Sequence, residues 1–325
     1  MDTPQKISLL RKMMLIRHFE EKLVLYKDQN KILGPFHCSV GQEAVSVGVC
    51  AALAKEDYVA GSHRAHGCMI AKGTNINALV AEIFGKVTGT NGGKGGSMHI
   101  NDAAVGGLGA SAIVGSSIPV ACGAAFASKY KKDGRVAVVF FGDGAVNEGV
   151  FYESLNLASI WKLPVIFVLE NNGFAISVAL RQVSVSHDLH LRAIPFGVTS
   201  KQVDGQSVDE VYEATKEALD SIHAGNGPVL IEAKTYRFNP HQQGAVYTRL
   251  EESGYRDKKE VEHWRGNRDP IKLYAGKLLK EGIVSDDEIE KIYLEEGEIV
   301  ENAIVFAAES LQPDETTLYQ NIYVK

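Results

Sequence analysis

Two apolar segments in the middle of the chain each end at polar residues. Residues 135–141 and 165–169 are rich in β-branched and aromatic side chains, and a stretch of helical character from about Ala145 to Trp161 separates them. This order predicts a βαβ unit whose two strands lie side by side and parallel. The same alternation of strand and helix continues at residues 197–203, 208–224 and 229–233. The pattern therefore predicts an α/β fold, with a doubly wound and mostly parallel sheet flanked by helices.

Helix signals stand at both ends of the chain. Thr3 is expected to cap a first helix, with Pro4 in its opening turn and an end near Asp28. The segment Ser285–Glu288 is a capping box that predicts a last long helix. We expect that helix to carry its apolar face on Ile289, Ile292, Tyr293, Ile299, Ala303 and Phe306. Other helices are expected at about 41–52, 75–86, 117–132 and 269–282.

No linker or repeat divides the chain, so we expect a single domain over residues 1–325, with helical extensions at about 1–35 and 265–325. Two segments lack a periodic pattern. Residues 89–112 are rich in glycine, and residues 240–254 are polar. We predict loops in both places, and long loops in compact domains are often functional.

Composition narrows the class of protein. The chain has 325 residues, of which 45% are apolar, and a net charge of −6 without a long basic run, so nucleic acid is not an expected partner. No apolar run approaches the length that spans a bilayer, and the N-terminus has no signal-peptide pattern. The four cysteines lack metal-binding spacing and are expected to be reduced, buried thiols. Together these features favour a cytoplasmic protein.

Polar side chains follow both strands of the predicted βαβ unit. Asp143 comes directly after the first strand, and Asn172 comes just after the second. Neighbouring strands lie about 4.8 Å apart, so both side-chain oxygens can reach one cation. Oxygen ligands of this kind suit Mg²⁺ or Ca²⁺ rather than zinc. The sequence therefore predicts a metal site at this edge of the sheet.

A phosphate site is predicted beside the metal. Gly142 and Gly144 allow a tight turn and a close approach of ligand to the backbone. The amides of Gly144 and Ala145 are expected to open a helix, and helix N-termini attract phosphate. A metal beside such a helix end suggests a diphosphate ligand.

These motifs carry a resemblance to a known family. Gly142-Asp-Gly followed about two dozen residues later by Asn-Asn172 resembles the thiamin diphosphate signature. From about Arg11 to Trp264 the chain is similar to α subunits of the E1 component of 2-oxo acid dehydrogenase complexes, of the acetoin and pyruvate dehydrogenase type. The further matching pieces are Gly41-Gln-Glu-Ala44, Arg64-Ala-His-Gly67, Gly92-Gly-Lys-Gly-Gly-Ser-Met-His99, Glu170-Asn-Asn-Gly173 and Thr235-Tyr-Arg237.

The resemblance implies roles for several residues. The backbone carbonyl of Phe174 would be the third protein ligand of the metal. His63 and Arg64 would bind the diphosphate, since a guanidinium can pair with a phosphate through two hydrogen bonds. His66 is expected to share that pocket, and His37 matches a family histidine associated with substrate.

Two further pieces of the family pattern are changed in this chain. Ala112 and Val114 match backbone contacts to the aminopyrimidine of the cofactor, but the first position is commonly glycine. A positive φ there would cost Ala112 about 1 kcal/mol. His241 matches a histidine near the cofactor that assists acyl transfer, although Asn239-Pro240 replaces the usual context. Gln242 stands where several relatives carry a phosphorylated serine.

The implied function is that of an E1 α subunit with thiamin diphosphate and Mg²⁺ as cofactors. It would cleave a 2-oxo acid or acetoin and pass the acyl group to a lipoyl-bearing E2 acyltransferase. The activating glutamate comes from a β subunit in this family, so an α₂β₂ heterotetramer is expected. The residues 117–130 are a candidate contact.

Three other functions are possible from the sequence. A dinucleotide-binding oxidoreductase is disfavoured, because Asn147 stands where the fingerprint needs a third glycine. A two-chain thiamin enzyme of transketolase or diketone-cleaving type, without a lipoyl acceptor, remains open. A non-catalytic paralogue is disfavoured by the intact Asp143, Asn172, Arg64 and His241.

Overall fold

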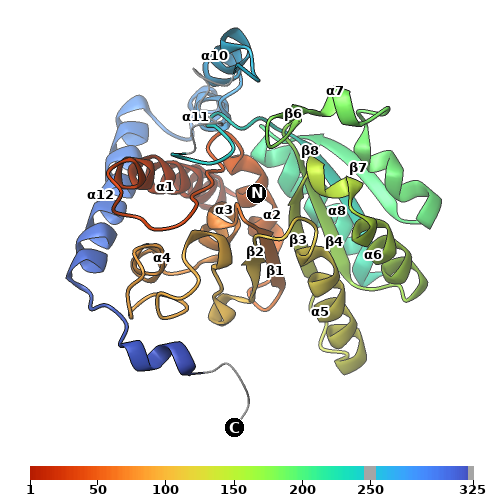
Figure 1. Cartoon of the computed structure of the whole chain (residues 1–325). Coiled ribbons are helices and arrows are strands. Elements are labelled where there is room, and N and C mark those ends of the chain that lie inside the picture. The colour runs from red at the N-terminus through yellow and green to blue at the C-terminus, as the bar shows by residue number, and fades with distance from the viewer. Residues whose placement is uncertain (245–253, 321–325) are drawn as a thin grey trace.

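One parallel sheet forms the centre of the molecule (Figure 1). The structure is a computed structural model that describes residues 1–244 and 254–320. In this part of the chain six strands pair in the order β2-β1-β3-β4-β8-β7, and every neighbouring pair is parallel. Their bounds are Tyr58–Ser62 for β1, Gly107–Ser111 for β2, Ala137–Gly142 for β3, Val165–Asn171 for β4, Thr199–Asp204 for β7 and Val229–Lys234 for β8. The predicted fold class and the adjacent pairing of β3 with β4 are confirmed.

Helices cover both faces of the sheet. The alternation of side chains along β3 divides the core in two, since Val138 and Phe140 join one cluster while Val139 and Phe141 join the other. The first cluster also contains residues of α1 (Thr3–Asp28), α2 (Glu43–Ala52), α3 (His66–Lys72), α4 (Ile76–Ile83), α8 (Val208–His223), α11 (Pro270–Lys280) and α12 (Asp286–Glu309). The second contains residues of α5 (Ser117–Lys131) and α6 (Gly149–Ile160). Both faces of the sheet are therefore buried, as a parallel sheet requires.

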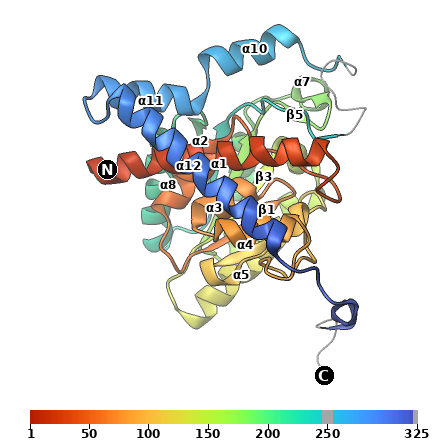
Figure 2. The ribbon, with the colours of Figure 1, turned by 90° about the vertical axis from the view of Figure 1, so that its left-hand side faces the viewer.

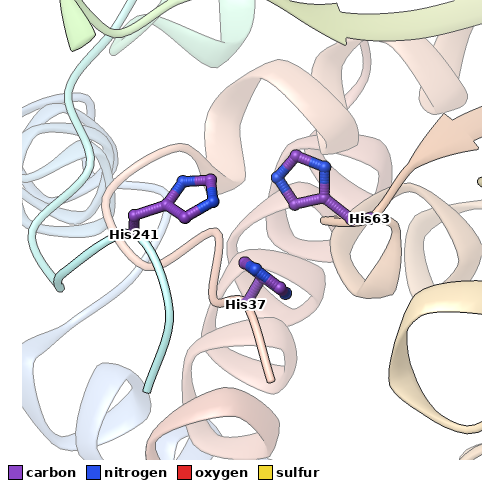
Figure 3. A group of neighbouring side chains, drawn as sticks. All are labelled: His37, His63 and His241. Carbon is purple, nitrogen blue, oxygen red and sulfur yellow. The ribbon is translucent and has the colours of Figure 1, made fainter. Parts of the chain in front are cut away.

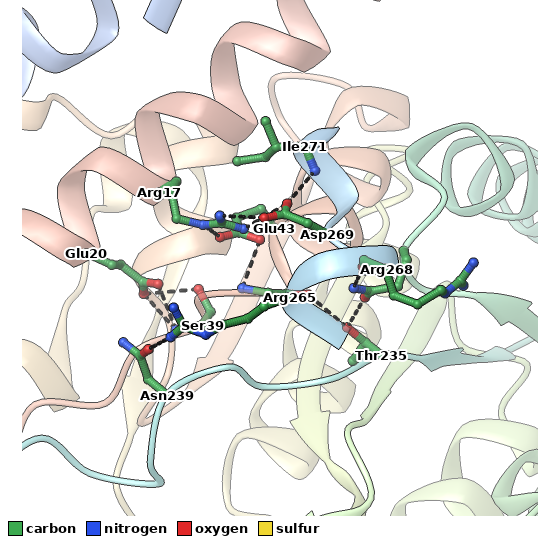
Figure 4. A network of polar contacts seen from close by, with 12 residues as sticks. Arg17, Glu20, Ser39, Glu43, Thr235, Asn239, Arg265, Arg268, Asp269 and Ile271 are labelled. Atoms are coloured by element: carbon green, nitrogen blue, oxygen red, sulfur yellow. Dashed lines mark hydrogen bonds and ion pairs between the residues drawn. The ribbon is translucent and has the colours of Figure 1, made fainter. Parts of the chain in front are cut away.

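The helical ends of the chain pack on each other. Figure 2 shows α12 crossing α1 and reaching α4, and these helices contact one another. A buried ion-pair network joins α1 to α2 and to the start of α11 (Figure 4). Arg17 Nε lies 2.5 Å from Glu43 Oε1, and its Nη1 lies 3.0 Å from Asp269 Oδ2. α1, α2 and α11 are thus fixed relative to one another. None of the helices in the described residues is long and apolar enough to cross a membrane.

Several element boundaries differ from the predictions. The predicted loop 89–112 contains the edge strand β2, and its single-turn 3₁₀ helices are Ser97–His99 and Ala103–Val105. The first helix is capped by Asp2, whose carboxylate accepts a hydrogen bond from the Gln5 amide. A 3₁₀ helix, Asp143–Asn147, precedes α6, so the amides after β3 belong to a tight turn and not to the α-helix. β1 and α3 had no counterpart among the predicted elements.

The last helix has its predicted start but a different buried face. The Ser285 hydroxyl and the Glu288 side chain form the capping box at its first turn. Ile292 and Ala303 are buried as expected, whereas Tyr293, Ile299 and Phe306 are exposed. The buried positions are Ile292, Glu296, Val300, Ala303, Ile304 and Ala307. This side of the helix packs on α1 and α4, and Glu296 forms an ion pair with Arg11 of α1 there.

Candidate active site

One pocket lies where the carboxyl ends of β1, β3 and β4 meet. The register of the two central strands places Gly142 opposite Glu170, so Asp143 and Asn172 leave neighbouring strand ends. Both lie in the pocket wall. Other lining residues include Gln42, His63, Arg64, Val114, Gly144, Ala145, Glu148, Glu170, Phe174 and His241. The structure thus brings most of the residues singled out in the sequence to one place, the carboxyl edge expected for ligands in such sheets.

Asp143 has a buried carboxylate oxygen without a partner. Its Oδ1 accepts a hydrogen bond from the Gly144 amide at 3.1 Å, but Oδ2 has no partner within the described part of the chain. Burial raises the pKa of Asp143 to about 6, against the opposing charge of Arg237. A buried charged oxygen without a partner is costly. A cation bound at Oδ2 would satisfy it, so the donor set fits a metal ion.

Asn172 faces the same space with a fixed side chain. Its Oδ1 accepts from the Phe174 amide at 3.2 Å, and its Nδ2 donates to Gln42 Oε1 at 3.2 Å. These bonds orient the amide, and its oxygen keeps a second lone pair. Gln42 follows Gly41, whose φ is +97° and where a Cβ would lie 2.5 Å from the Tyr236 carbonyl oxygen. Only glycine fits there, so the backbone that carries Gln42 is tightly specified.

Two buried guanidiniums lie at the pocket, Arg64 in its wall and Arg237 beside it. Arg64 donates to the carbonyls of Cys38 and His241. Arg237 donates to the Ile176 carbonyl at 3.1 Å, while its Nε and Nη1 are buried without partners in the described residues. Burial lowers the pKa of Arg237 to about 9, and the charge of Arg64 adds to this effect. Within residues 1–244 and 254–320 no carboxylate forms an ion pair with either side chain, so both fit an anionic ligand.

Three histidines meet at one end of the pocket (Figure 3). His37, His63 and His241 each offer a nitrogen within 4.8 Å of the others. Burial lowers the pKa of all three, to about 3 for His63 and about 2 for His241, so the rings are neutral at pH 7. Neutral imidazoles at this spacing could ligate a metal. However, Arg64 Nη2 lies 3.5 Å from His241 Nδ1, and its charge opposes a cation there.

Three predicted residues do not line the pocket. His37 lies against the lining residues His63 and His241 but is not itself part of the lining. His66 does not share the pocket, because its ring is fully buried between Glu20 and Ser97. The structure thus places His66 outside the pocket that it was expected to share. Ala112 precedes the lining residue Val114 but does not itself line the pocket, and its φ is not positive, so alanine costs little there.

Sequence reasoning gave no role to Gln42, Glu170 or Arg237. Each belongs to a short matching piece of sequence, but only the tertiary structure shows that Gln42 and Glu170 line the pocket and that Arg237 is buried beside it. Burial raises the pKa of Glu170 to about 7, although Arg64 opposes the shift. The sequence signal that could have identified Glu170 is its position as a glutamate at the end of a predicted buried strand.

The segment 239–254 is described only in part. Residues 245–253 lie outside the described residues, so the prediction that this loop is unusual stays a prediction. Its two ends are fixed, since Gln243 bridges to Phe36 and Arg256 donates to the Asn239 carbonyl at 2.9 Å. His241 is thereby held against Arg64.

The chain is similar to curated proteins over nearly its full length. Residues 11–316 match the family described as dehydrogenase E1 component. The α subunit of acetoin:2,6-dichlorophenolindophenol oxidoreductase is 40% identical in Cupriavidus necator, over 100% of this chain and 96% of that protein, and 41% identical in Bacillus subtilis, over 97% and 92%. The pyruvate dehydrogenase E1 component α subunit of Rhizobium meliloti is 38% identical, over 97% and 89%. The chain therefore belongs to the dehydrogenase E1 component family of oxidoreductases, as an α-type subunit.

Proposed function

We propose that this chain is the α subunit of a thiamin diphosphate-dependent E1 enzyme and binds the diphosphate end of the cofactor through Mg²⁺. The observation that carries the proposal is the buried, unpartnered Oδ2 of Asp143 in a pocket that also holds Asn172 and Arg64. Among the described residues, the Asp143 oxygen lacks a cation and the Arg64 guanidinium lacks a carboxylate partner. Both groups line the same pocket, which fits a metal–diphosphate pair.

Each part of the cofactor has residues that suit it. Asp143, Asn172 and the carbonyl of Phe174 would hold Mg²⁺ through oxygen. Gly144 and Ala145 would offer amides to the diphosphate, in a turn where a Cβ on Gly144 would lie 3.0 Å from Ala175 Cβ. The remaining cofactor contacts are assigned to His63, Arg64, His241 and the backbone of Ala112 and Val114.

The reacting end of the pocket would be served by His37 and His241. When bound, thiamin diphosphate supplies the carbon–carbon bond cleavage chemistry, and the protein binds, orients and desolvates it. Both rings are neutral because burial and Arg64 lower their pKa values. A neutral imidazole can accept a proton or donate a hydrogen bond to a substrate oxygen. We therefore assign them to substrate and acyl-group handling.

The substrate class follows the relatives. Their names specify acetoin and pyruvate dehydrogenase activities, so a 2-oxo acid or acetoin is the proposed substrate and lipoyl-E2 the proposed acceptor. The subunit names support a β partner. The proposed assembly is an α₂β₂ heterotetramer, and the proposed location is cytoplasmic. The alternative is a two-chain enzyme of transketolase or diketone-cleaving type without a lipoyl acceptor, which the changed Asn239-Pro240-His241 context favours.

Calorimetry tests this proposal directly. Thiamin diphosphate is titrated into the chain co-purified with its β partner, with Mg²⁺ and then with the metal chelated. We expect saturable binding that requires the metal. Metal-independent binding, or no binding to an intact complex, would contradict the assignment.

A further inference from the structure

A buried hydrogen-bonded chain runs through His66. Its Nδ1 lies 3.1 Å from Glu20 Oε1, and its Nε2 lies 2.9 Å from Ser97 Oγ. All three side chains are buried. We call Glu20, His66 and Ser97 the buried relay. Neither the fold nor the proposed cofactor contacts explain why three polar groups lie in this core.

The hydrogen-bond donors can be assigned at the Glu20 end of the relay. Glu20 accepts hydrogen bonds from the Ser39 amide at 2.9 and 2.8 Å and from the Ser39 hydroxyl at 3.0 Å (Figure 4). A carboxylate surrounded by donors in this way acts only as an acceptor, so His66 Nδ1 carries a proton and donates it. Nε2 is then free to accept from the Ser97 hydroxyl.

The order acid, histidine, serine is that of a hydrolytic triad. A nucleophile would need nearby amides to stabilise an oxyanion. The amides of Gly95 and Gly96 donate instead to the Glu82 carboxylate, at 2.6 and 3.1 Å. Ser97 is also only 4% exposed. The geometry therefore favours a positioning role over a hydrolytic one.

The relay joins the glycine-rich segment to the pocket wall. At one end of the relay, Ser97 follows the glycine-rich segment. Four backbone amides of this segment donate hydrogen bonds to the Glu82 carboxylate, those of Asn91, Gly93, Gly95 and Gly96. At the other end, Ser39 follows Cys38, whose carbonyl accepts from Arg64. His37 precedes Cys38 and lies in the histidine cluster.

The aromatic packing supports the same connection. The ring of Phe36 stacks on His66 with centroids 4.8 Å apart, and Phe36 begins the segment that leads to His37. Rotation of the His66 ring would therefore disturb both its hydrogen bonds and the backbone of residues 36–39. This backbone is what holds Arg64 in place through the Cys38 carbonyl.

We propose that the buried relay positions Arg64 and His37 for the anionic ligand of the pocket, so that His66 acts as a positioning residue through the backbone of residues 36–39. The proposal rests on the proposed function for the identity of that ligand, thiamin diphosphate with Mg²⁺. It assigns a task to the Ser97 hydroxyl and the Glu20 carboxylate, neither of which would touch the cofactor.

Two variants test the relay in the complex in which the chain purifies. Ser97→Ala removes one hydroxyl, and Glu20→Gln replaces an acceptor oxygen by a donor amide that faces the Ser39 amide. We expect the Kd for thiamin diphosphate with Mg²⁺ to rise about 10-fold in the first and at least as much in the second. If Glu20→Gln does not fold, the Kd of Ser97→Ala still tests the relay.

Ser128→Ala is the matched control. The Ser128 hydroxyl is buried and lies 2.5 Å from Asp133 Oδ1 and 2.7 Å from the Arg135 carbonyl oxygen, and Ser128 does not line the pocket. Its removal should lower Tm like Ser97→Ala but leave the Kd unchanged. Equal Kd values in wild type and Ser97→Ala would overturn the relay, whereas absence of cofactor binding in the wild type would contradict the proposed function instead.

A second readout does not depend on the cofactor. Long-range ¹H–¹⁵N spectra of histidine-labelled protein report which ring nitrogen carries the proton. We expect His66 to show a protonated Nδ1 and an accepting Nε2, whose shift changes in Ser97→Ala and not in Ser128→Ala. An Nε2 proton on His66, or labelling of Ser97 by a fluorophosphonate, would overturn the positioning role.

Discussion

At the scale of residues, the pocket is built from groups that burial leaves unsatisfied. Asp143 has a free oxygen, and Arg237 has two free nitrogens among the described residues. Such groups cost stability, and proteins keep them mainly where a ligand completes them. Such groups in and beside one pocket support a site that a ligand completes.

The first prediction concerns Asp143→Asn. Because burial raises the pKa of Asp143 to about 6, removal of its charge should stabilise the ligand-free chain at pH 8, by up to about 3 kcal/mol. The same change should abolish Mg²⁺-dependent binding of thiamin diphosphate. Thermal unfolding and calorimetry check the two effects. Asp133→Asn, at a turn outside the pocket, is the control and should change neither the binding nor its metal dependence.

The second prediction concerns pH. The pKa of His63 is about 3 in the folded chain and near 6.5 when unfolded, so the unfolded state binds more protons in between. The free energy of unfolding should therefore fall as the pH falls through this window. His63→Asn should reduce that slope by up to about 1.4 kcal/mol per pH unit between pH 5 and 6.5. Urea unfolding at several pH values measures it.

At the scale of elements, the residues that cap a helix predicted where the helix begins better than the apolar pattern predicted which of its faces is buried. The capping box at Ser285 and the cap at Asp269 are both present in the structure. The apolar face of α12 was misplaced, because apolar residues occur all around this helix and contact with α1 and α4 selects which of them are buried. The hydrogen bonds of a helix cap join residues that are close in the sequence, so the sequence predicts them. Which face of the helix is buried depends on the helices that pack against it.

The third prediction follows at this scale. Ser285→Ala removes the cap that accepts from the Glu288 amide at 3.2 Å. We expect a loss of about 1 kcal/mol in the free energy of unfolding, because one terminal amide loses its partner. Chemical denaturation measures it. Cofactor affinity should stay unchanged, since α12 contributes no residue to the pocket; a changed affinity would indicate coupling between this helix and the site.

At the scale of the whole molecule, α5 and α6 leave an apolar area uncovered. Phe126 contacts Trp161 with tilted rings whose centroids are 5.3 Å apart, and both side chains are nearly half exposed. Ile160 and Tyr130 are still more exposed on the same helices. Obligate interfaces are large and apolar. Phe126 and Tyr130 belong to the segment 117–130 that is expected to contact a partner.

The fourth prediction tests that contact. Phe126→Asp should prevent co-purification with the β subunit while leaving the chain folded, because a buried unpaired carboxylate is costly at an apolar interface. Size-exclusion chromatography and circular dichroism check assembly and folding. Val185→Asp, at a fully exposed position, is the control and should still assemble. The isolated chain should not turn over pyruvate or acetoin with added cofactor.

The sequence by itself determined the central βαβ unit and the position of Asp143 and Asn172 at neighbouring strand ends. Parallel pairing follows from the order strand, helix, strand, and the carboxyl ends then meet without further information. Helix caps were equally accessible, because a cap depends on residues only three positions apart.

The tertiary structure alone decided which distant side chains share the pocket. His37, His63 and His241 come from three separate segments, and nothing in their spacing indicates that their rings meet. His66 stands two positions from Arg64 but turns into the core, because α3 begins there and its ring bonds Glu20 and Ser97. The direction in which a side chain points at the start of a helix is set by residues that pack against it from distant parts of the sequence. A local sequence pattern does not contain these residues.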